Sequence, residues 1–74
     1  MGYYSVIILT RVKATGGRYD YDKFTPESVY FGEDEHLMQV KFYEAVRRAQ
    51  RMPAAETVVV WHDLEEIVRV KIEH

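Results

Sequence analysis

His62 and Asp63 are adjacent, and a carboxylate beside an imidazole can orient it as a general base. His36 or His74 could supply a second imidazole. The sequence offers these groups no nucleophile, because it has no cysteine and none of its serines lies in a Gly-x-Ser-x-Gly turn. Aspartate is common in turns, so we interpret the pair as part of a hairpin loop and expect no enzymatic activity.

Acidic residues gather in two stretches that could supply oxygen ligands to a divalent cation. Asp20, Asp22 and Glu27 form the first, and residues 33–36, Glu-Asp-Glu-His, form the second. Neither has the alternating ligands, central glycine and terminal glutamate of an EF-hand loop. We therefore expect a solvated loop and a negatively charged helix start, with no metal and no other cofactor.

Basic residues lie on or beside the polar side of a segment with helical periodicity. They are Lys41, Arg47, Arg48 and Arg51, which Arg18, Lys23, Arg69 and Lys71 could extend. With Tyr43 available for stacking, such a face could bind nucleic acid. The same segment carries as many acidic as basic residues, which weakens this hypothesis. Nucleic-acid binding is therefore the alternative function, and a steep salt dependence would be its signature.

Aromatic residues crowd the first half of the chain, and one small core cannot bury all of them. They are Tyr3, Tyr4, Tyr19, Tyr21, Phe24, Tyr30 and Phe31. Tyrosine and arginine are enriched at protein interfaces and at their hot spots. The predicted partner-binding residues are Arg18, Tyr19, Tyr21, Phe24 and Tyr30, with Tyr3 and Tyr4 as second choices. The alternative is that Phe24, Phe31 and Trp61 are core residues and the tyrosines are half-buried with hydrated hydroxyls.

The first half of the chain must position these aromatic residues. Residues 3–12 are β-branched and aromatic, and both alternating faces are largely apolar, which predicts a central strand. Gly16 and Gly17 permit a hairpin turn or the start of a loop. Aromatic and charged residues alternate over 18–22, which fits an edge strand. Residues 25–28, Thr-Pro-Glu-Ser, are instead typical of a helical turn. We therefore expect an irregular connection over 18–27. A short strand at 28–31, ended by Gly32, should follow.

The second half has clearer periodicity. Apolar residues at three- and four-residue steps predict an amphipathic helix from residue 33 or 34 to about residue 52, with acidic residues at its start, arginines near its end and Pro53 beyond it. Residues 57–61 and 66–73 are predicted strands, and residues 62–65 are short enough to join them as an antiparallel hairpin. The expected fold is a single two-layer α+β domain over residues 1–74, with one helix on a three- to four-stranded, mostly antiparallel sheet in the order β-β-α-β-β.

Composition limits the classes of function. With 74 residues and no disulfide, the chain has few sources of stability, which makes a homodimer a real possibility. A net charge of −2 gives no overall attraction to nucleic acid or to a membrane surface. The apolar runs are too short for a membrane span and no signal-type segment starts the chain, so we expect a reducing cytoplasm.

The leading hypothesis is therefore a small non-enzymatic module that binds a larger protein as its regulator or inhibitor. A phage-type antagonist of a host or defence protein is one version of it, suggested by the small size and the lack of catalytic motifs.

Overall fold

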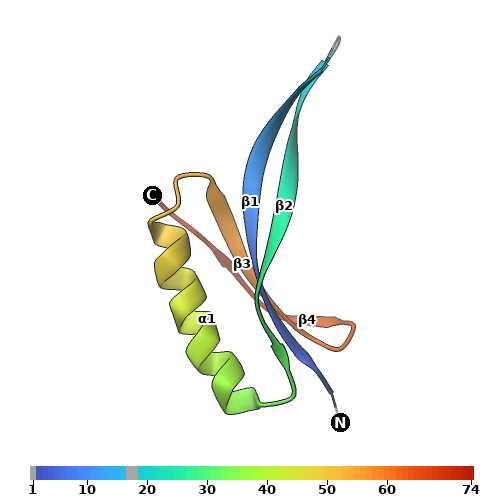
Figure 1. Cartoon of the computed structure of the whole chain (residues 1–74), viewed down its shortest axis with the longest axis vertical. Helices are drawn as coiled ribbons and strands as arrows, with labels where there is room; N and C mark the ends of the chain where they lie inside the picture. The colour runs from blue at the N-terminus through green and yellow to red at the C-terminus, as the bar shows by residue number, and fades with distance from the viewer. Residues whose placement is uncertain (1, 17–18) are drawn as a thin grey trace.

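The computed structural model describes residues 2–16 and 19–74, and it describes side chains for residues 2–11 and 24–74. Five elements follow one another, as Figure 1 shows: β1 (Tyr4–Gly16), β2 (Tyr19–Gly32), α1 (Glu35–Gln50), β3 (Ala55–His62) and β4 (Glu65–Lys71). The strands form one sheet in the order β2-β1-β3-β4, and each neighbouring pair is antiparallel. The helix packs on one face of this sheet. This confirms the predicted two-layer α+β fold and the central position of β1.

The irregular connection predicted over residues 18–27 is wrong for the part that the structure describes. From Tyr19 onward the chain belongs to β2, which pairs with β1 along its length and includes the predicted short strand at 28–31. Pro26 lies opposite Leu9 in this ladder. Since β2 is an edge strand, the missing N–H of Pro26 need not cost a hydrogen bond to a neighbouring strand. The alternating residues of 18–22, which fit an edge strand, thus predicted this region better than residues 25–28, whose types are typical of a helical turn.

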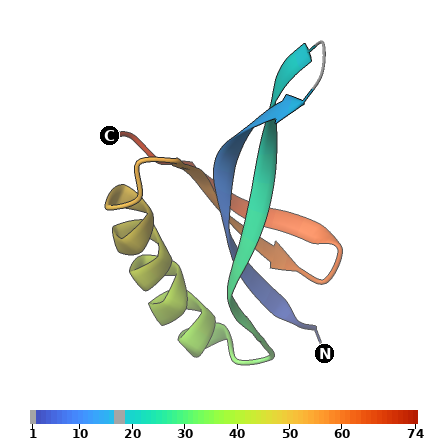
Figure 2. The same cartoon turned by 45° about the horizontal axis from the view of Figure 1, so that its top comes forward.

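The strands β1 and β2 continue together beyond the rest of the sheet. Pairing between β1 and β3 ends at Thr10 opposite Ala55, whereas β1 and β2 stay paired as far as Gly16 opposite Tyr19. We call residues 12–16 and 19–23 the arm. Figure 2 shows the arm extending away from the body of the domain. It lengthens the molecule to 46 Å, against 25 Å and 14 Å along its other axes.

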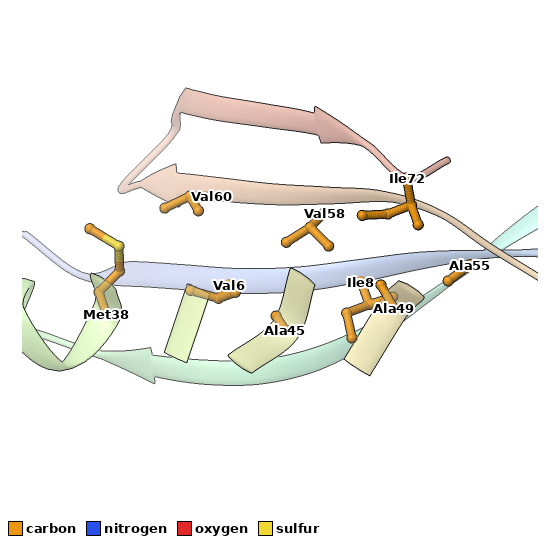
Figure 3. Close-up of a cluster of buried hydrophobic side chains, with 9 residues drawn as sticks. All are labelled: Val6, Ile8, Met38, Ala45, Ala49, Ala55, Val58, Val60 and Ile72. Atoms are coloured by element: carbon orange, nitrogen blue, oxygen red, sulfur yellow. The ribbon is translucent and has the colours of Figure 1, made fainter. Parts of the chain in front are cut away.

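The core lies between α1 and the sheet. Its buried side chains are Val6, Ile8, Met38, Ala45, Ala49, Ala55, Val58, Val60 and Ile72 (Figure 3). Ala45 and Ala49 are fully buried on the helix, and their small side chains let its backbone approach the strands closely. Valine and isoleucine from β1 and valine from β3 fill the opposite side. Buried and partly exposed residues alternate along β1, whereas Val58, Val59 and Val60 of β3 are all buried.

Polar contacts fix the connection between β2 and α1. Asp34 is the N-cap, and its Oδ1 accepts a hydrogen bond from the Leu37 amide at 3.0 Å. The Tyr30 hydroxyl accepts from the Asp34 amide at 3.1 Å and donates to the Asp34 carbonyl at 3.3 Å. The chain therefore leaves β2 and enters α1 in one defined direction.

The predicted hairpin between β3 and β4 is confirmed. His62 pairs with Glu65, so the loop consists of Asp63 and Leu64, and Asp63 adopts a φ of 56°. The Asp63 Oδ1 accepts from the Tyr3 amide at 2.9 Å, and the Asp63 amide donates to the Tyr3 carbonyl at 2.8 Å. These two bonds attach the start of β1 to the hairpin loop.

Candidate protein-binding surface

The sheet has a second face, opposite α1, that no other element covers within the described parts of the chain (Figure 2). Directly paired residues of antiparallel strands share a face, and successive residues alternate between faces. Because Val6, Ile8, Val58 and Val60 point toward the helix, their chain neighbours point the other way. We call this surface the open face. It consists of Tyr3, Ser5, Ile7, Leu9, Arg11, Phe24, Pro26, Ser28, Phe31, Thr57, Val59, Trp61, Glu66, Arg69 and Lys71.

The centre of the open face is apolar. Ile7 lies opposite Val59, and Leu9 and Trp61 are the next residues on the same face of their strands. Val59 is only 2% exposed although no second layer covers it, which means that the surrounding side chains close over it. The partly exposed Ile7, Leu9 and Trp61 thus form a continuous apolar strip across β1 and β3.

Aromatic rings stand at both ends of this strip. The rings of Tyr3 and Phe31 are stacked, with centroids 5.2 Å apart and planes 2° from parallel. Phe31 is 67% exposed and Tyr3 47% exposed, so much of the stacked pair is in contact with water. Near the base of the arm Phe24 is 51% exposed, and the Arg11 guanidinium lies 5.7 Å from the centre of its ring. Exposed rings around an apolar strip are characteristic of protein–protein interfaces.

Charged residues at the rim of the open face form ion pairs within the chain. Arg11 pairs with Glu56 at 2.9 Å, and Arg69 pairs with Glu66 at 2.6 Å. The hydrogen bond from Arg69, helped by its positive charge, lowers the pKa of the Glu66 carboxyl below its usual range, and Glu66 in turn raises the pKa of Arg69. Arg11 and Arg69, which border the apolar strip, therefore already have carboxylate partners.

The predicted partner-binding residues do not lie on one surface. Phe24 belongs to the open face, whereas Tyr30 lies on the helix side, packs against the core and bonds to Asp34. Arg18 lies outside the described residues, as do the side chains of Tyr19 and Tyr21, whose backbone belongs to the arm. Of the second choices, Tyr3 is on the open face, and Tyr4 packs against the core.

The main members of the open face were missed as contact residues. They are Ile7, Leu9, Phe31 and Trp61. The signal available was the apolar character of both faces of residues 3–12, because one helix can cover only one of them. That pattern by itself indicates a second apolar surface.

The basic residues considered for nucleic acid are partly neutralised. Arg48 pairs with Glu27 at 3.0 Å, and Lys41 pairs with Glu44 at 3.3 Å. Arg47 and Arg51 are exposed, and no ion pair is seen for either among the residues that the structure describes. An unbroken basic face is therefore absent from the described part of α1.

The His62–Asp63 pair holds the N-terminal end of β1. The imidazole is stacked on the Tyr4 ring with centroids 4.4 Å apart, and its Nε2 lies 3.9 Å from the Asp63 Oδ2. The other carboxylate oxygen accepts from the Tyr3 amide. Among residues 2–11 and 24–74, whose side chains the structure describes, no three histidine, aspartate or glutamate side chains converge as metal ligands.

An apolar groove of about 360 Å³ lies on the opposite side of the sheet from the open face, between α1 and β4. Its lining residues are Glu35, Met38, Gln39, Phe42, Tyr43, Val60, Ile67 and Val68. Tyr43 at its edge is 71% exposed, about as much as Phe31. Equivalent substitutions of Tyr43 and Phe31 can therefore be used to compare the two sides of the domain.

No helix in the described part of the chain is long and apolar enough to cross a membrane. No family model, curated protein or solved structure matches this chain.

Proposed function

We propose that the chain is a non-enzymatic protein-binding module that regulates or inhibits a larger protein, and that the open face is its contact surface. The observation that carries the proposal is the apolar strip of Ile7, Leu9 and Trp61 with the exposed Tyr3–Phe31 stack at its end. We place this activity in the cytoplasm, and a phage-type antagonist of a host or defence protein is the version that the small size and the lack of catalytic motifs suggest.

The energetics of the surface support this use. Each square ångström of apolar surface removed from water contributes about 25 cal/mol, and aromatic residues near the centre of an interface commonly cost at least about 2 kcal/mol when truncated. Tyr3 and Phe31 already hold each other in place by stacking, so docking costs less side-chain entropy than it would for two freely rotating rings. Because the side chains around Val59 are closely packed, the centre of the open face offers the partner a well-packed apolar surface.

The test is capture of partner proteins from a bacterial lysate by the tagged chain, with and without nuclease, followed by mass spectrometry. We expect a stoichiometric protein that survives nuclease and is captured by wild type and by Tyr43→Glu but not by Phe31→Glu. With the purified partner, Phe31→Glu should raise the dissociation constant by about 30-fold or more, which corresponds to a loss of about 2 kcal/mol of binding free energy.

Other outcomes would contradict the proposal. Loss of capture in Tyr43→Glu with Phe31→Glu unaffected would move the contact to the groove beside α1. Recovery of nucleic acid, lost when Arg47 and Arg48 are both replaced by alanine, would favour the alternative function through the helix.

A further inference from the structure

The helix covers only part of its own side of the sheet. Figure 3 shows α1 over β1 and β2, with β4 on the far side of β3, and α1 packs against β1, β2 and β3. Val68 of β4 lies opposite the buried Val60 and so belongs to this face, yet it is 38% exposed. Since α1 is the only helix in the described part of the chain, β4 has no second helix above it, and the apolar groove marks this gap.

The flank of α1 that faces β4 is almost uncharged. Its residues are Glu35, Gln39, Phe42 and Tyr43, which line the groove, and Val46 and Gln50, which follow at the same helical spacing. On the flank facing β2, Arg48 pairs with Glu27 of that strand, and Lys41, two turns earlier, pairs with Glu44. Exposed helix flanks normally carry such charges. The uncharged flank is therefore better suited to contact with an apolar surface than to hydration.

A β-bulge adds an exposed apolar side chain to the opposite wall of the groove. The register between β3 and β4 shifts after Val60, which leaves Ile67 without a directly opposite residue in β3. Ile67 and Val68 both line the groove, although consecutive residues of a regular strand point to opposite faces. Ile67 is 44% exposed. Apolar side chains thus stand on both sides of the groove, above the buried Met38 and Val60.

The space over β4 has the width of one helix. Neighbouring strands lie about 4.8 Å apart, so β4 is about 10 Å from β1, which lies beneath α1. Packed helices lie about 8–10 Å apart. A helix seated beside α1 would therefore lie directly over β4, with Phe42 on one side of it and Ile67 on the other.

The edge of β4 is poorly suited to pairing with an extended peptide. The bulge at Ile67 interrupts its ladder, and Glu66, Arg69 and Lys71 place charges along it. Natural sheets use bulges and charged residues to keep their edges from pairing with other strands. A helix is therefore a better occupant of the groove than a strand.

We infer that the groove binds an amphipathic helix of a second protein, antiparallel to α1. Glu35 begins α1 and lines the groove, and Glu65 begins β4 on the same face, since its opposite residue, His62, stacks on the core-packed Tyr4. Figure 1 places the start of α1 and the β3–β4 loop at the same end of the molecule. A helix antiparallel to α1 ends there, and lysine and arginine are favoured in the last turn of a helix. The bound helix thus combines an apolar stripe with a basic last turn.

This inference goes beyond the proposed function, because the groove and the open face lie on opposite sides of the sheet. The chain can hold its target on one side and the helix of a second protein on the other.

The test begins with site-specific photocrosslinking. The photoreactive p-benzoylphenylalanine replaces Tyr43, the chain is irradiated in a bacterial lysate, and mass spectrometry identifies the crosslinked segment. We expect a segment with apolar residues at three- and four-residue spacing and a basic C-terminal turn. Its synthetic peptide should bind the purified wild-type chain and gain helical circular dichroism on binding.

Variants of the chain then locate the peptide. Ile67→Glu should raise its dissociation constant by about 10-fold or more, because a buried apolar contact is lost. Val40→Glu is the matched control, since Val40 is 40% exposed and lies outside the groove. It should bind the peptide like wild type, and both variants should keep the far-ultraviolet spectrum of the wild type. Glu35→Lys should weaken binding, and glutamate in place of the basic residues of the peptide's last turn should restore it.

Several results would overturn the inference. They are the absence of a crosslinked segment, a segment without helical periodicity, a crosslink to a second copy of this chain, and equal binding of the peptide by wild type and Ile67→Glu. The crosslink from position 43 should persist in Phe31→Glu. If it does while no target depends on Phe31, the proposed contact surface alone is wrong. If a target depends on Phe31 and the groove crosslinks to no helix, the inference alone is wrong.

Discussion

Asp63 combines a backbone conformation and a hydrogen bond that few residues can supply together. Its φ of 56° is in the left-handed region, where aspartate, asparagine and glycine are tolerated best, and its carboxylate accepts from the Tyr3 amide. Asp63→Ala loses both properties, so we expect it to lower the free energy of unfolding by about 1–3 kcal/mol, as measured by urea denaturation. Asp63→Asn keeps an acceptor and the conformation. If it destabilised the chain as much as alanine does, this account of the loop would be wrong.

Glu66 gives a prediction about pH. Arg69 lowers the pKa of the Glu66 carboxyl in the folded chain, so the ion pair stabilises the fold above the ordinary glutamate pKa, and this contribution disappears as the pH falls through the lowered pKa. Arg69→Gln should return the pKa of Glu66 toward its usual range in an NMR titration. The stability difference between the two proteins should be present at neutral pH and vanish in acid. A pKa unchanged by the substitution would contradict the assignment.

At the scale of the element, the start of α1 depends on its cap. Asp34 satisfies the Leu37 amide, which would otherwise have no partner in the first turn. We expect Asp34→Ala to lower the free energy of unfolding by about 1 kcal/mol, whereas Asp34→Ser, another good N-cap, should cost much less. Chemical denaturation of the three proteins checks this. Equal losses for alanine and serine would show that the side-chain bond contributes little.

The elements differ in how far the sequence could predict them. Helix α1 was predictable because its apolar spacing, acidic start and following Pro53 all indicate the same structure. Strand β2 was not, since Pro26 opens a local helix-start pattern that only pairing with β1 overrides. The open face was missed for a related reason. The two apolar faces of residues 3–12 indicate its central strand. Which residues of the other three strands join it depends on the register between strands far apart in the chain, which leaves no local pattern.

At the scale of the whole molecule, stability should be unevenly distributed. Among the described residues, the arm has two strands and no third strand beside it. Val6 and Val60, in contrast, are paired in the centre of the sheet and packed beneath α1. Two-stranded ribbons are only marginally stable in water. In native-state hydrogen exchange, amides of residues 12–16 and 19–23 should therefore exchange much faster than those of Val6 and Val60. Equal protection throughout would mean that the arm is held by contacts beyond its own ladder.

The strand order also sets the sequence of events during synthesis. Strand β1 precedes its partner β3 by two elements, β2 and α1, so Ile7 cannot pair with Val59 until both of these have been made. Only the β1–β2 hairpin can form early, and by itself it has no helix-covered core. Contacts between distant parts of a chain slow folding. Until β3 is available, the apolar faces of β1 lack this partner, and transiently exposed apolar surface of this kind favours aggregation during folding.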